Sequence, residues 1–594
     1  MMRRRNAPAD RHVFFLSTVF IVLAAFPLCC LDAPALAGNE KTVALVMKAL
    51  TNPFFSKMES GAKSYAQQHG IPLEVFGVER ETDVERQISI LENLISRGYG
   101  AIVIAPADSK ALVPVCAKAF EAKIAVINVD NPLHRETLKK LGVSIPFVGS
   151  DNREGAAKIG DYLKRKLGGR GRVMVIEGIR GVENADQRKT AFTKAVKRGP
   201  AIEIVASESA NWHTDEALSL AIRLLEKHGP VDAIFCANDK MALGALQALD
   251  ISGSAGKVWL AGYDNIEAVR HEMRDGRIHA TVEQHPELMG EFGVQLAVQS
   301  LNGERVPQFI ATPVDLVTCE TFDKKIGLSI SEMKNPFFAS LHRQAEQTAL
   351  LHGMKLTVYD ARNDEAQQLT DLMSLLNDPI DALIVNPTNT ETVGPGIELA
   401  NQKSIPVVTV DRKASDGKVV CHIESDNVKG GRMAAGILAD HLGGRGNIVE
   451  LEGIPGTSAS QERGAGFNDA LREYPEIHVA ARVVADFERP RAREVMIELF
   501  KRLPKIDGVF AHNDNMILGA MEAFESFPGV KTTVLVGFDG IREARSALRE
   551  GRLTATVVQQ PEKMGALAVE SIAMLYRGER PMPNILVDLM VMEK

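Results

Sequence analysis

Two long stretches of this chain carry the same residues in the same order. Asn-Pro-Phe-Phe at positions 52–55 returns at 335–338, and Cys-Ala-Asn-Asp at 236–239 returns as Ala-His-Asn-Asp at 511–514. The second pair is separated by 513 minus 238, or 275 residues. A period of this length indicates duplicated domains and not a solenoid of short units. The sequence therefore predicts two modules built on one plan.

The length of the chain agrees with this division. At 594 residues it is too long for one ordinary core, and two modules of about 280 residues each have room for two lobes. We expect a first module at 38–318, a short linker at 319–324 and a second module at 325–594. The linker contains neither Gly nor Pro, so it is not a long flexible tether. The two modules are expected to touch.

The N-terminus has the pattern of an export signal. Four arginines among the first eleven residues precede an apolar run at 13–31, and Ala-Leu-Ala at 35–37 offers a cleavage site. We predict that residues 1–37 are a signal peptide cleaved after Ala37. An uncleaved anchor is the alternative, because the apolar run approaches the length that spans a bilayer. A lipid anchor at Cys29 is disfavoured because Leu28 is too large for that signal.

Charge and cysteine content narrow the function classes. The net charge is −7, and removing four Arg and two Asp with residues 1–37 makes it −9. A mildly acidic protein is a poor binder of nucleic acid, so no such partner is expected. The remaining cysteines share no repeated position and lack metal-ligand spacing, which predicts free, mostly buried thiols and no metal site. They are Cys116, Cys236, Cys319 and Cys421.

Short β-rich apolar runs alternate with amphipathic helical patterns. In the first module the strands are predicted at 43–47, 73–76, 101–104 and 124–129, and, after a break near Gly149, at 173–176, 202–205, 233–235 and 258–261. The junction is predicted to join a last strand at 313–317 to a new one at 325–330. Such alternation is typical of parallel sheets covered by helices on both faces. The predicted fold class is α/β.

The residues that follow the predicted strands are unusually polar. In parallel sheets of this kind, ligands bind beyond the carboxyl ends of the strands. In the first module the polar residues at these ends are Lys48, Asp130, Asn131, Asn238 and Asp264. In the second they are Ser331, Asn386, Asp411, Arg412, Asn513 and Asp539. Each module therefore has a candidate binding site.

The residue types suit a neutral polyol. Hydroxyl groups donate and accept hydrogen bonds, so Asp, Asn and Arg side chains bind them, and aromatic rings cover the C–H faces. Arg188 and Arg463 add planar donors, and the aromatic candidates are Phe54, Phe55 and Trp212 with Phe337, Phe338 and Phe487. A ligand that lacks one hydroxyl leaves its protein partner unpaired, at about 1 to 3 kcal/mol.

Each of these residues also has a purely structural interpretation. Asn-Pro at a helix start gives an N-cap with Pro at the first helical position, and the two Phe could be core residues. Asp264 could cap the next helix, and Arg188 could lie on a helix surface. The glycine runs at 168–171 and 443–446 lack the Gly-Lys-Ser/Thr of a phosphate loop and are interpreted as turns. Recurrence of the polar set in both modules favours binding.

Catalytic signatures are missing from the sequence. It contains no His-Glu-x-x-His, no nucleophile elbow and no phosphate loop, and the Asp residues are explained as acceptors for hydroxyl groups. We expect a protein that is not an enzyme, with no catalytic residue and no cofactor.

Each module resembles the type I periplasmic sugar-binding proteins of the ribose-binding family. The second module matches the ribose-binding members at Ser331, Asn335, Phe337, Phe338, Asn386, Asp411, Arg412, Arg463, Phe487, Asn513, Phe538, Asp539 and Gln559. The first resembles the allose-binding branch at Lys48, Asn52, Phe54, Phe55, Asp130, Asn131, Arg188, Trp212, Asn238, Asp264 and Gln284. The resemblance implies that these side chains contact a sugar.

The modules differ at matched positions. Ser331, Asn386, Arg412, Phe487 and Phe538 of the second are replaced in the first by Lys48, Ala105, Asn131, Trp212 and Tyr263. Replacing Arg412 by asparagine and Ser331 by lysine moves the positive charge from one wall of the cleft to another. A guanidinium and an ammonium are not interchangeable as hydrogen-bond donors. We predict ribose or a similar pentose for the second module and a hexose such as allose, or another polyol, for the first.

The resemblance also implies a mechanism. Each module would have two doubly wound lobes joined by three strands, crossing near Ser150, Gln284 and Thr312 and near Ser425, Gln559 and Val587. The lobes would close on the sugar, as periplasmic binding proteins do.

The closed form would be presented in the periplasm to a membrane ABC permease. The alternative is a sensor of sugars or furanosyl signals that presents it to a chemoreceptor or sensor kinase. A repressor of this fold would begin with a helix-turn-helix where this chain has an export signal.

Overall fold

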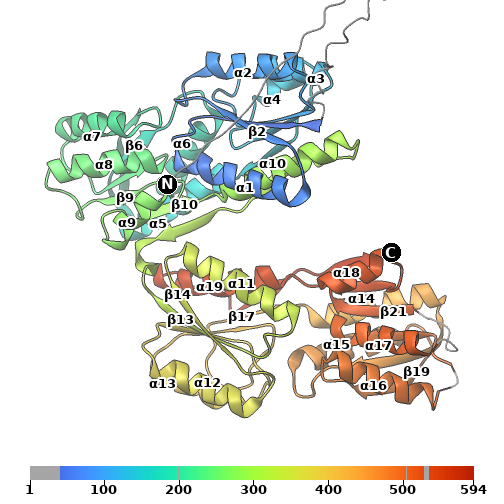
Figure 1. The fold of residues 1–594 in the computed structure, drawn as a ribbon. Helices are drawn as coiled ribbons and strands as arrows, with labels where there is room; N and C mark the ends of the chain where they lie inside the picture. Colours follow the sequence, from blue (N-terminus) through green and yellow to red (C-terminus); the bar gives the residue numbers. More distant parts are fainter. Residues whose placement is uncertain (1–40, 199–200, 504, 528–533, 594) are drawn as a thin grey trace, which may run out of the picture.

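The computed structural model describes residues 41–198, 201–503, 505–527 and 534–593, which form two modules of two lobes each (Figure 1). The predicted signal peptide, with its cleavage after Ala37, lies outside the described residues. Among the described residues, no helix has the length and apolar character needed to cross a bilayer.

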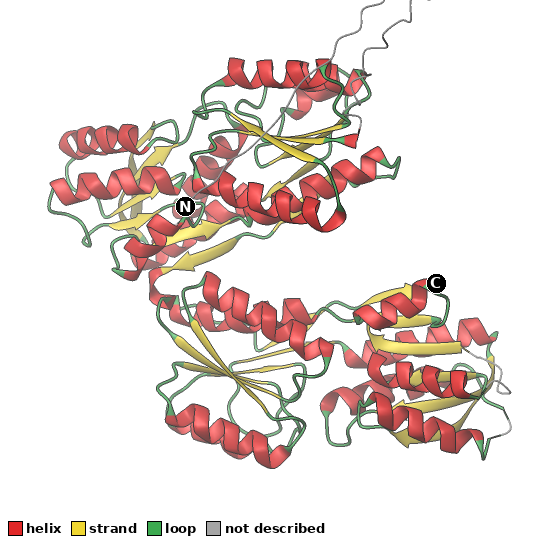
Figure 2. Ribbon diagram, in the orientation of Figure 1, coloured by secondary structure: helices red, strands yellow, loops and turns green. Residues whose placement is uncertain are grey.

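The first lobe of the first module is a parallel sheet between two layers of helices (Figure 2). It contains β1 (Val43–Met47), α1 (Pro53–His69), β2 (Leu73–Gly77), α2 (Val84–Ser96), β3 (Ala101–Ile104), α3 (Val113–Glu121), β4 (Ala125–Val129), α4 (Arg135–Lys140), β5 (Phe147–Ser150), α10 (Pro286–Leu301) and β11 (Phe309–Thr312). The strand order is β11-β5-β4-β3-β1-β2. Helices α1 and α10 bury one face of the sheet, and α2 and α3 the other.

The second lobe repeats this plan. It contains α5 (Asn152–Lys166), β6 (Arg170–Glu177), α6 (Glu183–Val196), β7 (Ala201–Ser209), α7 (Thr214–His228), β8 (Ala233–Cys236), α8 (Asp239–Ile251), β9 (Trp259–Ala261), α9 (Glu267–Arg274), β10 (Ala280–Glu283) and β12 (Asp315–Thr318). The strand order is β12-β10-β9-β8-β6-β7, and only the edge strand β12 runs antiparallel. The last strand begins at Asp315 and not at the predicted Pro313, because proline has no N–H for the ladder.

The second module has the same two lobes. Its first lobe contains β13 (Lys325–Ile330), α11 (Pro336–Leu351), β14 (Lys355–Asp360), α12 (Glu365–Asn377), β15 (Ala382–Val385), α13 (Gly394–Gln402), β16 (Val407–Val410), β17 (Cys421–Ser425), α19 (Pro561–Tyr576) and β23 (Asn584–Val587). Its second lobe contains α14 (Asn427–Leu442), β18 (Arg445–Glu452), α15 (Ser458–Leu471), β19 (Glu476–Val484), α16 (Arg489–Phe500), β20 (Gly508–Ala511), α17 (Asp514–Ser526), β21 (Val534–Asp539), α18 (Arg542–Arg549), β22 (Ala555–Val558) and β24 (Met590–Glu593). The strand orders are β14-β13-β15-β16-β17-β23 and β19-β18-β20-β21-β22-β24.

The predicted α/β fold with three crossings in each module is confirmed. In the first module the chain changes lobe between β5 and α5, between β10 and α10, and between β11 and β12. In the second it does so between β17 and α14, between β22 and α19, and between β23 and β24. Central strands such as β1 and β3 are apolar and buried throughout. A sheet covered on both faces requires such continuous apolar strands. These apolar runs are the pattern from which the strands were predicted.

The two modules differ in length at two places in their first lobes. The offset between matched residues is 283 at Asn52 and Asn335, 281 at Asp130 and Asp411, and 275 from Ser150 onward. Two residues of this difference lie in the loop between β2 and α2, which covers 78–83 in the first module and 361–364 in the second. The remaining difference in length lies in the segment between β4 and β5, which contains helix α4 in the first module.

The modules touch, as the short linker predicted. The linker begins with a 3-10 turn, Cys319–Thr321, and Phe322 packs with the core of the preceding lobe, to which Leu351 of α11 also contributes. The Arg270 guanidinium on α9 donates to the last carbonyls of α11, at 2.6 Å to Leu351 O and 2.7 Å to Leu350 O. Arg577, after α19, donates to Leu316 O at 3.2 Å. The second lobe of the first module is thus bonded directly to the first lobe of the second (Figure 1).

The four cysteines among the described residues are free thiols. Cys116, Cys236 and Cys421 are buried and Cys319 is half-buried, as the sequence predicted. Within the described chain, no group of His, Cys, Asp and Glu side chains has the arrangement of a metal site.

Candidate functional site

Each module has a small polar cavity between its lobes. The first is lined by Lys48, Asn52, Phe54, Phe55, Glu81, Asp130, Asn184, Arg188, Trp212, Asn238, Asp264 and Gln284. The second is lined by Asn335, Phe337, Phe338, Asp411, Arg412, Ala459, Arg463, Phe487, Asn513, Asp539 and Gln559. In both modules these residues follow the carboxyl ends of strands from both sheets, where open α/β sheets place their ligands.

The Asn-Pro-Phe-Phe segment both starts a helix and lines the cavity. Asn52 caps α1, because its Oδ1 accepts a hydrogen bond from Phe54 N at 3.1 Å, and the same side chain lines the cavity. Phe54 and Phe55 are buried edge to face at 5.1 Å and also line it. Helix formation therefore holds the side chains in position, and the structural and binding interpretations are compatible.

A buried arginine is fixed in the same way in each module. Arg188 Nε donates to Asn152 Oδ1 at 2.7 Å, and its Nη1 donates to Ala237 O at 2.9 Å. Its guanidinium stacks on the Tyr263 ring at 3.8 Å. Arg463 repeats the pattern with Asn427, His512 O and Phe538, at 2.9, 2.6 and 4.0 Å. The arginine is thus a preorganised donor at the cavity wall.

Each arginine faces a carboxylate held by a glutamine. Gln284 Nε2 donates to Asp264 Oδ1 at 2.7 Å, and Gln559 Nε2 donates to Asp539 Oδ1 at the same distance. Burial raises the pKa of Asp264 well above its usual range, although Arg188 opposes the shift. Burial likewise raises the pKa of Asp539, against the effect of Arg463. These groups are costly to bury and are suited to binding hydroxyls, which both donate and accept.

The backbone is unusual at the same cavity positions in both modules. Positive φ occurs at Asp130, Trp212 and Asp264 (62°, 69° and 116°) and at Asp411, Phe487 and Asp539 (66°, 61° and 118°). Such values are uncommon for residues other than glycine and concentrate at functional sites. Their recurrence shows that the two copies keep one cavity geometry.

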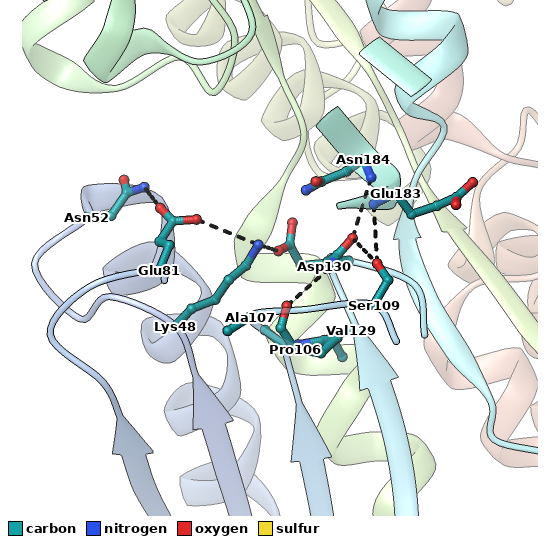
Figure 3. A network of polar contacts seen from close by, with 12 residues as sticks. Lys48, Asn52, Glu81, Pro106, Ala107, Ser109, Val129, Asp130, Glu183 and Asn184 are labelled. Atoms are coloured by element: carbon teal, nitrogen blue, oxygen red, sulfur yellow. Dashed lines mark hydrogen bonds and ion pairs between the residues drawn. The ribbon is translucent and has the colours of Figure 1, made fainter. Parts of the chain in front are cut away.

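The first cavity has a charged wall formed by Lys48, Glu81 and Asp130 (Figure 3). Lys48 Nζ lies 3.2 Å from Asp130 Oδ2 and 3.6 Å from Glu81 Oε2, and Glu81 Oε1 accepts a hydrogen bond from Asn52 Nδ2 at 3.1 Å. Burial lowers the pKa of Lys48, but the carboxylates of Asp130 and Glu81 outweigh it and the net pKa is raised. Lys48 is therefore an ammonium.

The second cavity has Arg412 on its wall. Its Nη1 donates to Pro387 O at 3.1 Å, and the guanidinium lies over the rings of Phe338 and Phe487 at 5.3 and 5.5 Å. Burial lowers the pKa of Arg412 to about 10, against the effect of Asp411. It stays protonated at neutral pH and offers donors only.

Four residues of the sequence-derived sites stand outside the lining sets. Asn131 donates to Pro106 O and accepts from Ser109 Oγ. Ser331 Oγ donates to Asn386 Oδ1 at 2.6 Å, and Asn386 Nδ2 donates to Val410 O. Phe538 lies under Arg463. These residues brace the wall from behind.

Three residues that line the cavities were not predicted from the sequence: Glu81, Asn184 and Ala459. Asn184 and Ala459 are counterparts at the offset of 275, so a residue-by-residue comparison of the copies could have found that difference. Glu81 lies in the lengthened loop 78–83, where the copies have no matching residue.

Both modules are closed, because hydrogen bonds cross each cleft. Lys57 Nζ on α1 lies 3.2 Å from Glu283 Oε2, and Glu183 N donates to Ser109 Oγ at 3.2 Å. In the second module, Lys413 N donates to Ser458 Oγ at 2.9 Å and Thr390 N to Gly456 O at 3.1 Å. The cavities are therefore seen in the form that would enclose a ligand.

A family model described as the periplasmic binding protein domain matches residues 43–305 and again residues 326–580. The chain belongs to the periplasmic binding protein family. The double match confirms the tandem duplication in this periplasmic binding protein, and it covers both cavities.

Curated relatives match about half of this periplasmic binding protein. The ribose import binding protein of Bacillus subtilis is 43% identical over 264 residues, which are 44% of this chain and 85% of the relative. The D-ribose/D-allose-binding protein of Pseudomonas aeruginosa is 42% identical over 287 residues, 47% of this chain and 89% of the relative. The D-allose-binding periplasmic protein of Escherichia coli is 34% identical over 296 residues, 48% of this chain and 94% of the relative.

Proposed function

We propose that this protein captures two different monosaccharides in the periplasm and delivers them to an ABC-type sugar permease. The observation that carries the proposal is the recurrence, in each module, of an enclosed polar cavity with a buried arginine, a facing carboxylate and aromatic walls. These groups match the hydroxyls and C–H faces of a sugar. The relatives named for ribose and allose binding support this substrate class.

Cleft closure is the proposed mechanism. The ligand drives closure only through contacts that it makes better in the closed form. In the first module Asn52 and Arg188 belong to opposite lobes and line one cavity, as Asn335 and Arg463 do in the second. A sugar that bonds to both lobes therefore stabilises the closed form, which is the form a permease would receive. No bond of the sugar is made or broken.

The two modules are proposed to have different ligands. The second, at 325–594, has Arg412 and Phe487 on its cavity wall and is assigned ribose or a similar pentose. The first, at 38–318, has Lys48 and Trp212 and is assigned a hexose such as allose or another polyol. Delivery is favoured over the sensing alternative because similar relatives are named for import.

Calorimetry of the full chain with two matched variants tests this function. Arg463→Ala should weaken D-ribose binding about 100-fold, because it removes one or two charged hydrogen bonds to the sugar, worth about 1.5 to 3 kcal/mol each. Arg188→Ala should leave D-ribose binding unchanged and weaken binding of the second sugar found in a screen of hexoses and polyols.

Arg305→Ala and Arg580→Ala are the controls, since both arginines are exposed and lie outside the cavity linings. Absence of binding by any pentose, hexose or polyol would overturn the proposal, as would turnover of a sugar by the purified protein.

A further inference from the structure

We infer that Glu81 and Asn184 determine the specificity of the first module, by presenting hydrogen-bond acceptors that the second module lacks. The ligand class is a neutral hexose or sugar alcohol that directs hydroxyl donors at this wall. The inference rests on the proposed function, namely that the first cavity binds a polyhydroxylated ligand.

Glu81 reaches the cavity because its loop is long. The segment 78–83 between β2 and α2 has two more residues than 361–364 in the second module. Glu81 is 6% exposed and lines the cavity, with Oε1 bonded to Asn52 and Oε2 facing Lys48. The shorter loop ends in Asp364, which is exposed and caps α12 by accepting from Gln367 N at 2.8 Å. The second module therefore has no carboxylate at the place of Glu81.

Asn184 approaches the same wall from the other lobe. It lies on α6, is 3% exposed and points toward Asp130 across the cleft (Figure 3). Its Oδ1 is buried without a hydrogen-bond partner. Asp130 Oδ2 is ion-paired with Lys48 Nζ at 3.2 Å and has no other partner. An unpartnered buried acceptor is destabilising, so a donor from a ligand to Asn184 Oδ1 would be favourable here.

The corresponding wall of the second module differs at both places. Ala459 replaces Asn184, and Arg412 lines the cavity, with its Nε 3.7 Å from Asp411 Oδ2. In the first module the matching Asn131 is bonded to Pro106 and Ser109. A ligand group that accepts from Arg412 in the second cavity would meet no such donor at this position in the first, where Asn184 and Glu81 present acceptors. Sites with buried polar groups strongly reject a ligand that leaves those groups unpaired.

The charge of the cluster disfavours an anionic ligand. Lys48 lies between the carboxylates of Glu81 and Asp130. An anionic group placed on this wall would meet these carboxylates at short range, where like charges repel strongly in a buried site. Hydroxyl donors satisfy the acceptors without adding charge.

The test uses the full chain with Arg463→Ala, which silences the second cavity. Calorimetry measures affinities for D-ribose, D-allose, xylitol and myo-inositol, with Glu81→Gln or Asn184→Ala added. Glu79→Gln is the control, because Glu79 is exposed in the same loop. A hexose or polyol should bind more tightly than D-ribose. Each cavity variant should weaken that ligand at least tenfold and change D-ribose affinity less than threefold. The ratio of two affinities within one variant does not depend on how much of the protein is folded.

Three outcomes are distinguishable. If none of the four compounds binds, the proposed function of the first module fails, and this inference fails with it. If a compound binds but both variants leave its preference over D-ribose unchanged, or if D-ribose binds most tightly, the acceptor-based selection is wrong while sugar binding stands. If the preference falls in both variants and is kept in Glu79→Gln, the inference is supported.

Discussion

Arg463 shows what a single residue contributes to these cavities. Its guanidinium is held by Asn427 and His512 O, stacks on Phe538 and lies 3.7 Å from Asp539. A lysine keeps the charge but has neither the planar fork nor the stacking face. We therefore expect Arg463→Lys to weaken D-ribose binding at least tenfold, measured by calorimetry. Affinity equal to that of the unaltered protein would show that charge alone is needed.

Asp539 gives the protein a dependence on pH. Its carboxyl has a pKa of about 7 in the folded chain, raised from 3.8 mainly by burial. Between about pH 4 and 7 the folded chain holds a proton that the unfolded chain has released, so the free energy of unfolding falls as pH rises through this window. Asp539→Asn removes the contribution of this carboxyl. Its melting temperature relative to the unaltered protein should rise by several degrees from pH 4 to pH 7.5, since 1 kcal/mol shifts such a domain by roughly 2 to 4 °C.

Thermal melting without added sugar makes this measurement. Asp588→Asn is the matched control, because Asp588 is exposed and outside the cavity lining. If the difference in melting temperature between Asp539→Asn and the unaltered protein stays constant across the pH range, the raised pKa assigned to Asp539 is wrong.

At the residue scale, the predicted site residues that line the cavities are side chains that follow strands or begin helices. Asn52, Arg188 and Asp264 line the cavity with their counterparts Asn335, Arg463 and Asp539. The sequence did not distinguish lining residues from bracing ones such as Ser331 and Asn386, because both kinds are polar and follow strands. Which way a side chain points depends on neighbours that the sequence does not place.

At the scale of elements, two glycines make room for the aromatic walls. A Cβ on Gly453 would lie 2.0 Å from Phe487 Cζ, and one on Gly178 would lie 2.1 Å from the Trp212 ring. Each glycine follows the first strand of its lobe's sheet, so the ring packs directly on the turn after that strand. The position of the aromatic ring at each cavity thus depends on a residue that carries no side chain.

Gly453→Ala should displace the Phe487 ring. We expect a loss of about 1 to 3 kcal/mol in the free energy of unfolding, as for other overpacked sites, and weaker D-ribose binding. Chemical denaturation and calorimetry measure the two effects. Gly436→Ala in α14 is the control, because no atom lies within 4 Å of its added Cβ. That variant should be neutral or more stable by up to about 1 kcal/mol. Equal effects of the two variants would contradict the role given to Gly453.

The elements themselves were predictable because apolar strands alternate with amphipathic helices and turns separate them. The loop 78–83 was not. The change in offset between Asn52 and Asp130 shows that residues are inserted, but it does not say where. Only folding shows that the insertion brings Glu81 into the cavity. Glu81, the residue that most distinguishes the two sites, therefore lies in the loop where the two copies have no matching residue.

At the scale of the whole molecule, the modules are joined by buried polar contacts. Arg577 donates to Leu316 O of the first module and pairs with Glu570 and Glu579 of the second. Burial raises the pKa of Glu570, but His352 and Arg577 outweigh it and lower the pKa to about 2. A charged cluster therefore holds together the second lobe of the first module and the first lobe of the second.

Arg577→Ala should destabilise the junction. Removing the guanidinium leaves the half-buried Glu570 with His352 as its remaining partner and takes one donor from Leu316 O, which we expect to cost about 1 to 3 kcal/mol. Scanning calorimetry of the full chain should show a lower melting temperature for the variant, whereas Arg580→Ala, at an exposed neighbouring position, should not change it. An unchanged melting temperature in Arg577→Ala would mean that the modules are held together by other contacts.

Native mass spectrometry of the full chain with D-ribose and D-allose together tests most directly whether one molecule carries two differently selective sugar sites. The expected result is a chain that holds one D-ribose and one D-allose at once. Arg463→Ala should lose only the D-ribose, and Arg188→Ala only the D-allose. Two molecules of D-ribose on one chain, or mutual displacement of the two sugars, would contradict this account.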